Sequence, residues 1–274
     1  MVERPGSAAK LILVGGHESN HGKDLGHLAA ALPGVRIVTA GRSLQTALSD
    51  ALASATADVV VLPMTFGRNP TLVADTAKTM KWLADGGGGG RVALSESFGT
   101  PDHLIAWLRT AATKVHASGD NSALLLLAAK ANPFDDAELF RIAHLVRTHG
   151  TGSEVEAACV GNDGEIAAAL GRLHLLGHES VVIIPAGFAQ TCTAPLGQGA
   201  FEDATFCGPL LTPQTVLRVI NDRFTAALHE LSHGRDGIAA GLTADHGHGY
   251  AHSHAFEEGQ GHTHTHGLAH SHTH

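Results

Sequence analysis

The chain has 274 residues, of which 43% are hydrophobic and only 4% aromatic, so it can bury a large core built mainly from Ala, Gly, Val and Leu. A net charge of -8 and only 18 scattered lysines and arginines argue against nucleic acid as a partner, because phosphates are bound by clustered cations. Three cysteines without a CxxC pair argue against a disulfide framework. No secretory signal or membrane-spanning apolar run is seen, so we expect a cytoplasmic protein that binds no membrane.

The first half of the chain alternates short apolar strands with amphipathic helices. Strands are predicted where apolar residues run without interruption, and helices where they recur every three or four positions. The third strand ends at Pro63, and Pro101 opens the last helix. In chain order the predicted elements are strand 11–14, helix 25–32, strand 35–39, helix 44–55, strand 59–62, helix 71–83, strand 92–94 and a helix from 101.

The same alternation restarts in the second half. Its third strand also ends in a proline, Pro185, and its last helix also opens with one. The segments LILVGGHESN and ADVVVLPMTFG match LLLLAAKANP and ESVVIIPAGFA, which indicates an internal duplication of about 110–120 residues. The predicted elements are strand 123–127, helix 137–146, strand 155–159, helix 165–175, strand 181–184, strand 205–206 and helix 213–231.

Strands that alternate with such helices are typical of parallel βαβ units, and strands apolar on both faces fit a sheet covered on both sides. We therefore predict an α/β fold of two tandem, similar modules, each around a four-stranded parallel sheet. The expected modules are residues 1–118 and 119–236. From Gly237 onward the composition shifts to Gly, Ala, His, Thr and Ser, so residues 237–274 are predicted to be a disordered tail.

Ten of the 21 histidines lie in this tail, mostly two positions apart. A flexible segment of this kind can bring several imidazoles to one Ni, Co, Cu or Zn ion. Expression tags are usually unbroken histidine runs, so we interpret the interrupted segment as a native metal store or delivery device. The predicted tail ligands are His246, His248, His252, His254, His262, His264, His266, His270, His272 and His274.

The order of strand, turn, helix, strand-proline and proline-led last helix resembles the class II chelatase family. These enzymes insert cobalt, nickel or iron into sirohydrochlorin-type tetrapyrroles, and long members have two such halves. The resemblance covers roughly residues 10–232. It is carried best by VEAACVGNDGEIAAALGRLHLLGHESVVIIPAGF and by the closing GPLLTPQTVLRVINDRF, with Arg223 where the family often has arginine.

The departures from this family fall on the metal-binding turns. His17 stands in a Gly-Gly-His-Glu turn, where the family has a His-Gly-Ser type of turn. Near the expected second histidine the chain has Asn69, and near the expected aspartate it has Asp75. The resemblance implies insertion of a divalent metal, first of all cobalt, else nickel or iron, into sirohydrochlorin or a relative, without a nucleotide.

Chemically suited residues follow the ends of strands, where an open parallel sheet forms its ligand cleft. Imidazole and carboxylate together suit Co, Ni, Fe or Zn. We predict His17 and Glu18 as catalytic groups, and His17 and His21 as metal ligands. The simpler interpretation is that His17 caps a turn and His21 is surface. The predicted substrate contacts are Asn69, Asp75, Asn132 and Gln190, with Asp135 and Cys192 in similar loops.

Two other functions stay open. A chain that kept the fold and lost catalysis would be a metallochaperone or metal store, which the absent second histidine favours. Residues His229 to His233 spell the H-E-x-x-H of zinc proteases, but they end the last helix at the edge of the fold. The expected partners are a tetrapyrrole, metal ions and a metal-delivery protein.

Overall fold

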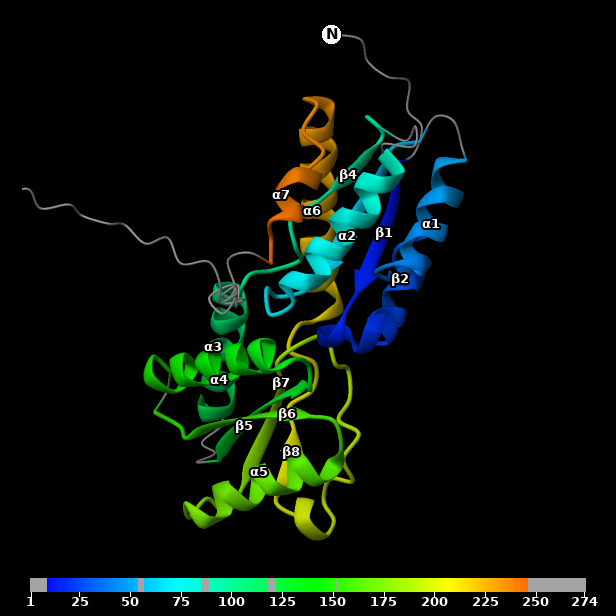
Figure 1. The fold of residues 1–274 in the computed structure, drawn as a ribbon. Coiled ribbons are helices and arrows are strands. Elements are labelled where there is room, and N and C mark those ends of the chain that lie inside the picture. The colour runs from blue at the N-terminus through cyan, green and yellow to red at the C-terminus, as the bar shows by residue number, and fades with distance from the viewer. Residues whose placement is uncertain (1–8, 54–56, 85–88, 118–121, 151, 246–274) are drawn as a thin grey trace, which may run out of the picture.

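The computed structural model describes residues 9–53, 57–84, 89–117, 122–150 and 152–245, and it forms two four-stranded sheets in which every strand pair is parallel (Figure 1). The first half contains β1 (Lys10–Gly15), η1 (His17–Ala30), β2 (Arg36–Thr39), α1 (Arg42–Leu52), β3 (Val59–Met64), α2 (Pro70–Leu83), β4 (Val92–Leu94) and α3 (Pro101–Ala117). The second contains β5 (Ala123–Ala129), α4 (Pro133–Thr148), β6 (Val155–Val160), α5 (Asp163–Leu175), β7 (Val181–Pro185), η3 (Gly199–Phe201), β8 (Ala204–Phe206), α6 (Pro213–Ser232) and α7 (Ile238–Leu242).

The two sheets repeat one topology, which confirms the predicted α/β fold of two similar modules. Their strand orders are β2-β1-β3-β4 and β6-β5-β7-β8. The register repeats as well, because Val14 pairs with Pro63 and Leu127 pairs with Pro185. His17 lies three residues after Val14, and Lys130 lies three residues after Leu127, so these two positions correspond in the repeat. In the same way, Phe66 after Pro63 corresponds to Phe188 after Pro185.

The last helix of each half packs against the sheet of the other half. Helix α3 contacts α4 and β7, and helix α6 contacts β3 and β4 (Figure 1). In the cluster under α6, Ala227 and Leu231 pack on Val60 and Ala93. The predicted division at residue 118 follows the repeat in the sequence, whereas the packing places α3 with the second sheet.

The segment after β1 differs from the predicted helix 25–32. Element η1 is a 3-10 helix that starts at His17 and contains a break from Ser19 to Gly22. Asn20 and His21 have φ angles of 49° and 55°, in the left-handed region that L-residues rarely adopt. The break turns the chain sharply beside the end of β1, where Gly15 leaves no room for a Cβ against the Gly22 backbone.

The predicted start of the tail at residue 237 is wrong. Residues 238–242 form helix α7, which packs on α2, and Ile238 is only 5% exposed. The Leu94 N–H donates to the Asp236 carbonyl at 2.8 Å, so this segment is bonded to β4. The ten predicted tail ligands, from His246 to His274, lie outside the described residues. Within the described part of the chain, no helix combines the length and apolar character that crossing a membrane requires.

Candidate functional site

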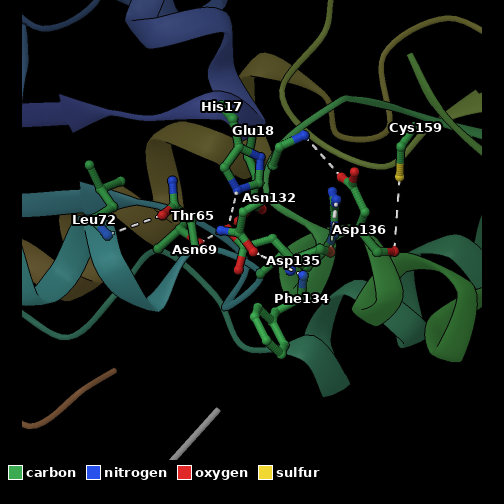
Figure 2. Close-up of polar contacts among 12 residues, drawn as sticks. His17, Glu18, Thr65, Asn69, Leu72, Asn132, Phe134, Asp135, Asp136 and Cys159 are labelled. Atoms are coloured by element: carbon green, nitrogen blue, oxygen red, sulfur yellow. Dashed lines mark hydrogen bonds and ion pairs between the residues drawn. The ribbon is translucent and has the colours of Figure 1, made fainter. Parts of the chain in front are cut away.

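Loops that follow the strands of both halves meet between the two sheets. The turn after β1 contacts β5, and the Phe188 N–H after β7 donates to the Glu18 carbonyl at 2.9 Å. The start of α4 completes this region (Figure 2). The approach is close, because a Cβ on Gly187 would lie 2.6 Å from the Glu18 carbonyl oxygen.

His17 is held by a carboxylate from the other half. Its Nε2 lies 3.2 Å from Oδ2 of Asp135, and the two side chains are only 12% and 6% exposed (Figure 2). Asp135 is positioned by the cap of α4, where the Asn132 side chain accepts from the backbone N–H groups of Phe134 and Asp135. Sequence analysis placed Asp135 in a loop but gave it no part in orienting His17.

The contact between His17 and Asp135 determines which ring nitrogen of His17 is available to bind a metal ion or a proton. A carboxylate can only accept hydrogen bonds, so in the neutral imidazole the hydrogen sits on Nε2 and Nδ1 presents a lone pair. Nδ1 is buried and has no hydrogen-bond partner. A carboxylate that orients one nitrogen while the other stays open is the usual support of a metal-binding imidazole. The same geometry also suits a proton acceptor.

Glu18 points away from His17 into the loop after β3. The Thr65 hydroxyl donates to one carboxylate oxygen, and the Phe66 N–H donates to the other at 2.8 Å. Thr65 in turn accepts from the Gly67 N–H at 2.9 Å. The buried carboxylate therefore clamps this loop, and both of its oxygens are occupied. The catalytic role of Glu18 therefore stays a prediction.

His17 and His21 are the two predicted metal ligands within the described residues, and they are not part of a metal-binding cluster there. His21 is exposed, and in the described ranges no three His, Cys, Asp or Glu side chains lie close enough to hold a metal ion. Within the described residues, His17 would therefore contribute a single nitrogen. One ligand suits an ion that is passed on better than an ion that is stored.

The four side chains predicted to bind substrate make hydrogen bonds to residues close to them in the sequence. Asn69 caps α2 by accepting from the Leu72 N–H at 3.1 Å, and Asn132 caps α4 as described. Asp75 lies on α2, where it pairs with Lys78 at 3.0 Å in solvent. Gln190 donates to the Phe188 carbonyl at 2.8 Å, within its own loop. Asn69 and Asn132 do frame the site, because each opens a helix there, whereas Asp75 faces away into solvent.

Arg68 is a buried cation that sequence analysis missed. It is 1% exposed, and its guanidinium donates to the carbonyls of Ala186 and Asp135, each at 3.4 Å. Its Nε has no partner, and no described carboxylate lies within ion-pair distance of it. A cavity of about 330 Å³ adjoins Arg68 and Asp135. Burying a charge without a counter-ion costs free energy, so an anionic group of a ligand placed beside Arg68 would be stabilised.

Stacked aromatic rings form the apolar contact between the halves. Phe66 and Phe188, which correspond in the repeat, stack with their ring centroids 4.5 Å apart. Phe98 and Trp107 pack edge-on against Phe66, at 5.3 and 5.4 Å. No sequence pattern pointed to this cluster, because its members are single aromatic residues in separate loops and one helix.

Comparison with known proteins identifies the fold. No family model and no curated protein matches the chain. The structure matches that of SirB from Bacillus subtilis with Fe3+ at 12% sequence identity and a TM-score of 0.51, covering 83% of this chain and 98% of that one. The fold is that of the chelatase SirB. A sirohydrochlorin chelatase SirB from Bacillus subtilis subspecies spizizenii in complex with cobalt gives 10% identity, a TM-score of 0.46, and coverage of 84% and 97%.

The H-E-x-x-H motif lies at the far end of α6 on this chelatase fold. His229 and His233 are neighbours, with ring centroids 4.7 Å apart. The Glu230 carboxylate binds the Arg235 guanidinium, which lowers the pKa of Glu230. A zinc protease would need this carboxylate free as a base and a third ligand, and the described residues offer no such cluster.

Proposed function

We propose that the chain is a metal chelatase that inserts a divalent transition metal into sirohydrochlorin or a related tetrapyrrole. Cobalt is the first candidate, and nickel or iron follows. The observation that carries the proposal is His17, whose Nδ1 is unpartnered while Asp135 of the other half holds Nε2. The SirB-like fold supports the same conclusion, since the SirB structures contain Fe3+ or cobalt.

Insertion exchanges one metal ion for the two protons of the pyrrole nitrogens. In the proposed reaction, Nδ1 of His17 first binds the incoming ion. Four pyrrole nitrogens then outcompete this single imidazole, and the ion leaves the protein. The vacated Nδ1 can take one released proton, and the Asp135 carboxylate stabilises the resulting imidazolium. The second proton goes to water.

Arg68 fits an acidic macrocycle better than it fits a stored metal. A guanidinium beside the metal path repels a resident cation, whereas it attracts the carboxylates of a sirohydrochlorin-type ligand. Because Nδ1 is buried, the ion can reach it only when the residues that cover it move aside. We propose that the reaction takes place in the cytoplasm without a nucleotide, and that a delivery partner or the tail supplies the metal.

The test is insertion of Co(II) into sirohydrochlorin by purified protein, followed by absorbance. His17→Ala removes the ligand and base and should lower the rate by about 100-fold or more. Asp135→Asn should lower it by roughly 10- to 100-fold, because the amide can donate to Nε2 and move the imidazole hydrogen onto Nδ1. His21→Asn, in the same turn, is the matched control and should keep the wild-type rate. Full activity of His17→Ala would overturn the proposal.

A metallochaperone or metal store is the second candidate. It is favoured by the ten histidines beyond residue 245, which the sequence analysis interprets as a native metal store. Deleting residues 246–274 should then remove most of the bound metal equivalents measured by equilibrium dialysis. If the full chain binds metal but inserts none into any tetrapyrrole, the store is the correct function. If the deletion variant inserts Co(II) normally in excess metal, the tail only supplies the ion.

A further inference from the structure

A second cavity, apart from the one beside Arg68, lies between α3 and the loop that leads from β8 to α6. Its volume is about 550 Å³, within the range of sites for small organic ligands. Trp107, Leu210 and Leu211 provide apolar lining, and Thr110, Thr212 and Thr215 add hydroxyl groups. None of the residues proposed for metal insertion lines it.

The described residues that line this cavity carry positive charge. Lys114 and Arg218 both line it, and neither makes an ion pair with any described residue. Elsewhere, cations such as Lys130 and Arg172 are paired with glutamates. Among the described residues, no Asp or Glu lines the cavity, although the chain carries a net charge of -8. Two cations without an ion-pair partner or a lining carboxylate in the described part of the chain produce a positive potential that attracts an anion.

The apolar lining decides what kind of anion fits. Trp107 presents an indole to the cavity and also packs on Phe66 of the aromatic cluster. A flat ring can lie against such a side chain with favourable stacking. A small hydrophilic anion would gain nothing from Trp107 and Leu211, and an apolar ligand would leave both cations unused.

We propose that this cavity binds a ring-bearing organic anion with at least two carboxylates. The ring lies against Trp107 and the leucines, and the carboxylates pair with Lys114 and Arg218. Two sources share this chemistry: the rim of a carboxylated tetrapyrrole, and a small aromatic polycarboxylate. The inference stands independently of metal insertion, since it rests on residues that the insertion step does not use.

Calorimetric titration of the metal-free full chain tests the proposal. The probes are uroporphyrin, a carboxylated macrocycle, benzene-1,3,5-tricarboxylate, a small ring, and citrate, which has no ring. Lys114→Gln and Arg218→Gln should each weaken binding of the preferred ring probe by roughly 10-fold, as expected for the loss of one charge-assisted hydrogen bond. Arg109→Gln is the matched control, because Arg109 is an exposed cation on the same helix that does not line the cavity.

The location of binding is read from Cys207, which also lines the cavity. The bound probe should slow alkylation of Cys207 by N-ethylmaleimide, measured by peptide mass spectrometry. Tight binding of uroporphyrin alone identifies a tetrapyrrole, and tight binding of the tricarboxylate identifies a small aromatic ligand. The proposal is overturned if citrate binds as tightly as both ring probes, if Arg109→Gln weakens binding as much as Lys114→Gln, or if Cys207 is not protected. His17→Ala should bind the probe normally, which separates this result from failure of metal insertion.

Discussion

Variants of Glu18 can separate two roles of its carboxylate, a structural one that holds the loop after β3 and that of a catalytic base. The sequence places it beside His17, whereas the structure turns its carboxylate into the loop after β3, where Thr65 and Phe66 donate to it. Glu18→Ala removes two hydrogen bonds to a charged group, each worth about 1.5–3 kcal/mol, and leaves a buried N–H without an acceptor. Relief of the carboxylate's desolvation offsets part of this loss.

The net effect should be a destabilisation of about 3 kcal/mol, the low end of the range for removing one partner of a buried charged contact. For a protein of this size that corresponds to a melting temperature lower by roughly 6–12 °C. Glu18→Gln keeps an acceptor for the Phe66 N–H and should cost only about 1 kcal/mol. Thermal melts followed by circular dichroism measure both values.

The insertion assay on the same variants completes the test. If the clamp is the whole role of Glu18, Glu18→Gln should keep most of the activity at a temperature where it is folded. A catalytic base predicts the reverse pattern, in which Glu18→Gln melts like the wild type and is inactive. An unchanged melting temperature for Glu18→Ala would refute the clamp directly.

Three further outcomes follow from close packing and burial. Gly187→Ala should destabilise the fold by about 1–3 kcal/mol in a denaturant titration, because the added Cβ would meet the Glu18 carbonyl at 2.6 Å, and a wild-type midpoint would contradict this close approach. Phe188→Ala should cost about 3–5 kcal/mol in the same measurement, since it removes a buried ring stacked on Phe66. Partial burial raises the pKa of the Cys159 thiol to about 12, so its alkylation by iodoacetamide should stay slow from neutral pH up to about pH 9, and rapid labelling in the native state would contradict the raised pKa.

The alternation of strands and helices could be predicted because each element leaves its own periodic pattern. Apolar runs such as Val59 to Leu62 mark strands covered on both faces, and the structure extends this one only to Met64. The proline that follows it recurs in the second half, which made the duplication visible. Helix α7 left no such signal, since five residues are too few to show a period.

The arrangement of the candidate site depends on contacts that a periodic pattern does not contain. His17 and Asp135 are 118 positions apart, so their pairing follows from how the halves dock. The direction of Glu18 depends on where the loop after β3 lies, because Thr65 and Phe66 donate to its carboxylate. The burial of Arg68 could not be read from a loop sequence, because an isolated arginine is usually on the surface.

Because the halves exchange helices, a single module could not cover its own sheet without a partner. Alone, one repeat would leave a sheet face bare and a helix projecting without cover, so its stable form would be a symmetric dimer in which two copies swap helices. In such a dimer every position exists twice and must serve both copies. Fusion into one chain removes that constraint. The position of His17 is filled in the second half by Lys130, which forms an ordinary surface ion pair with Glu165. The two halves can therefore carry different residues at corresponding positions, such as His17 and Lys130.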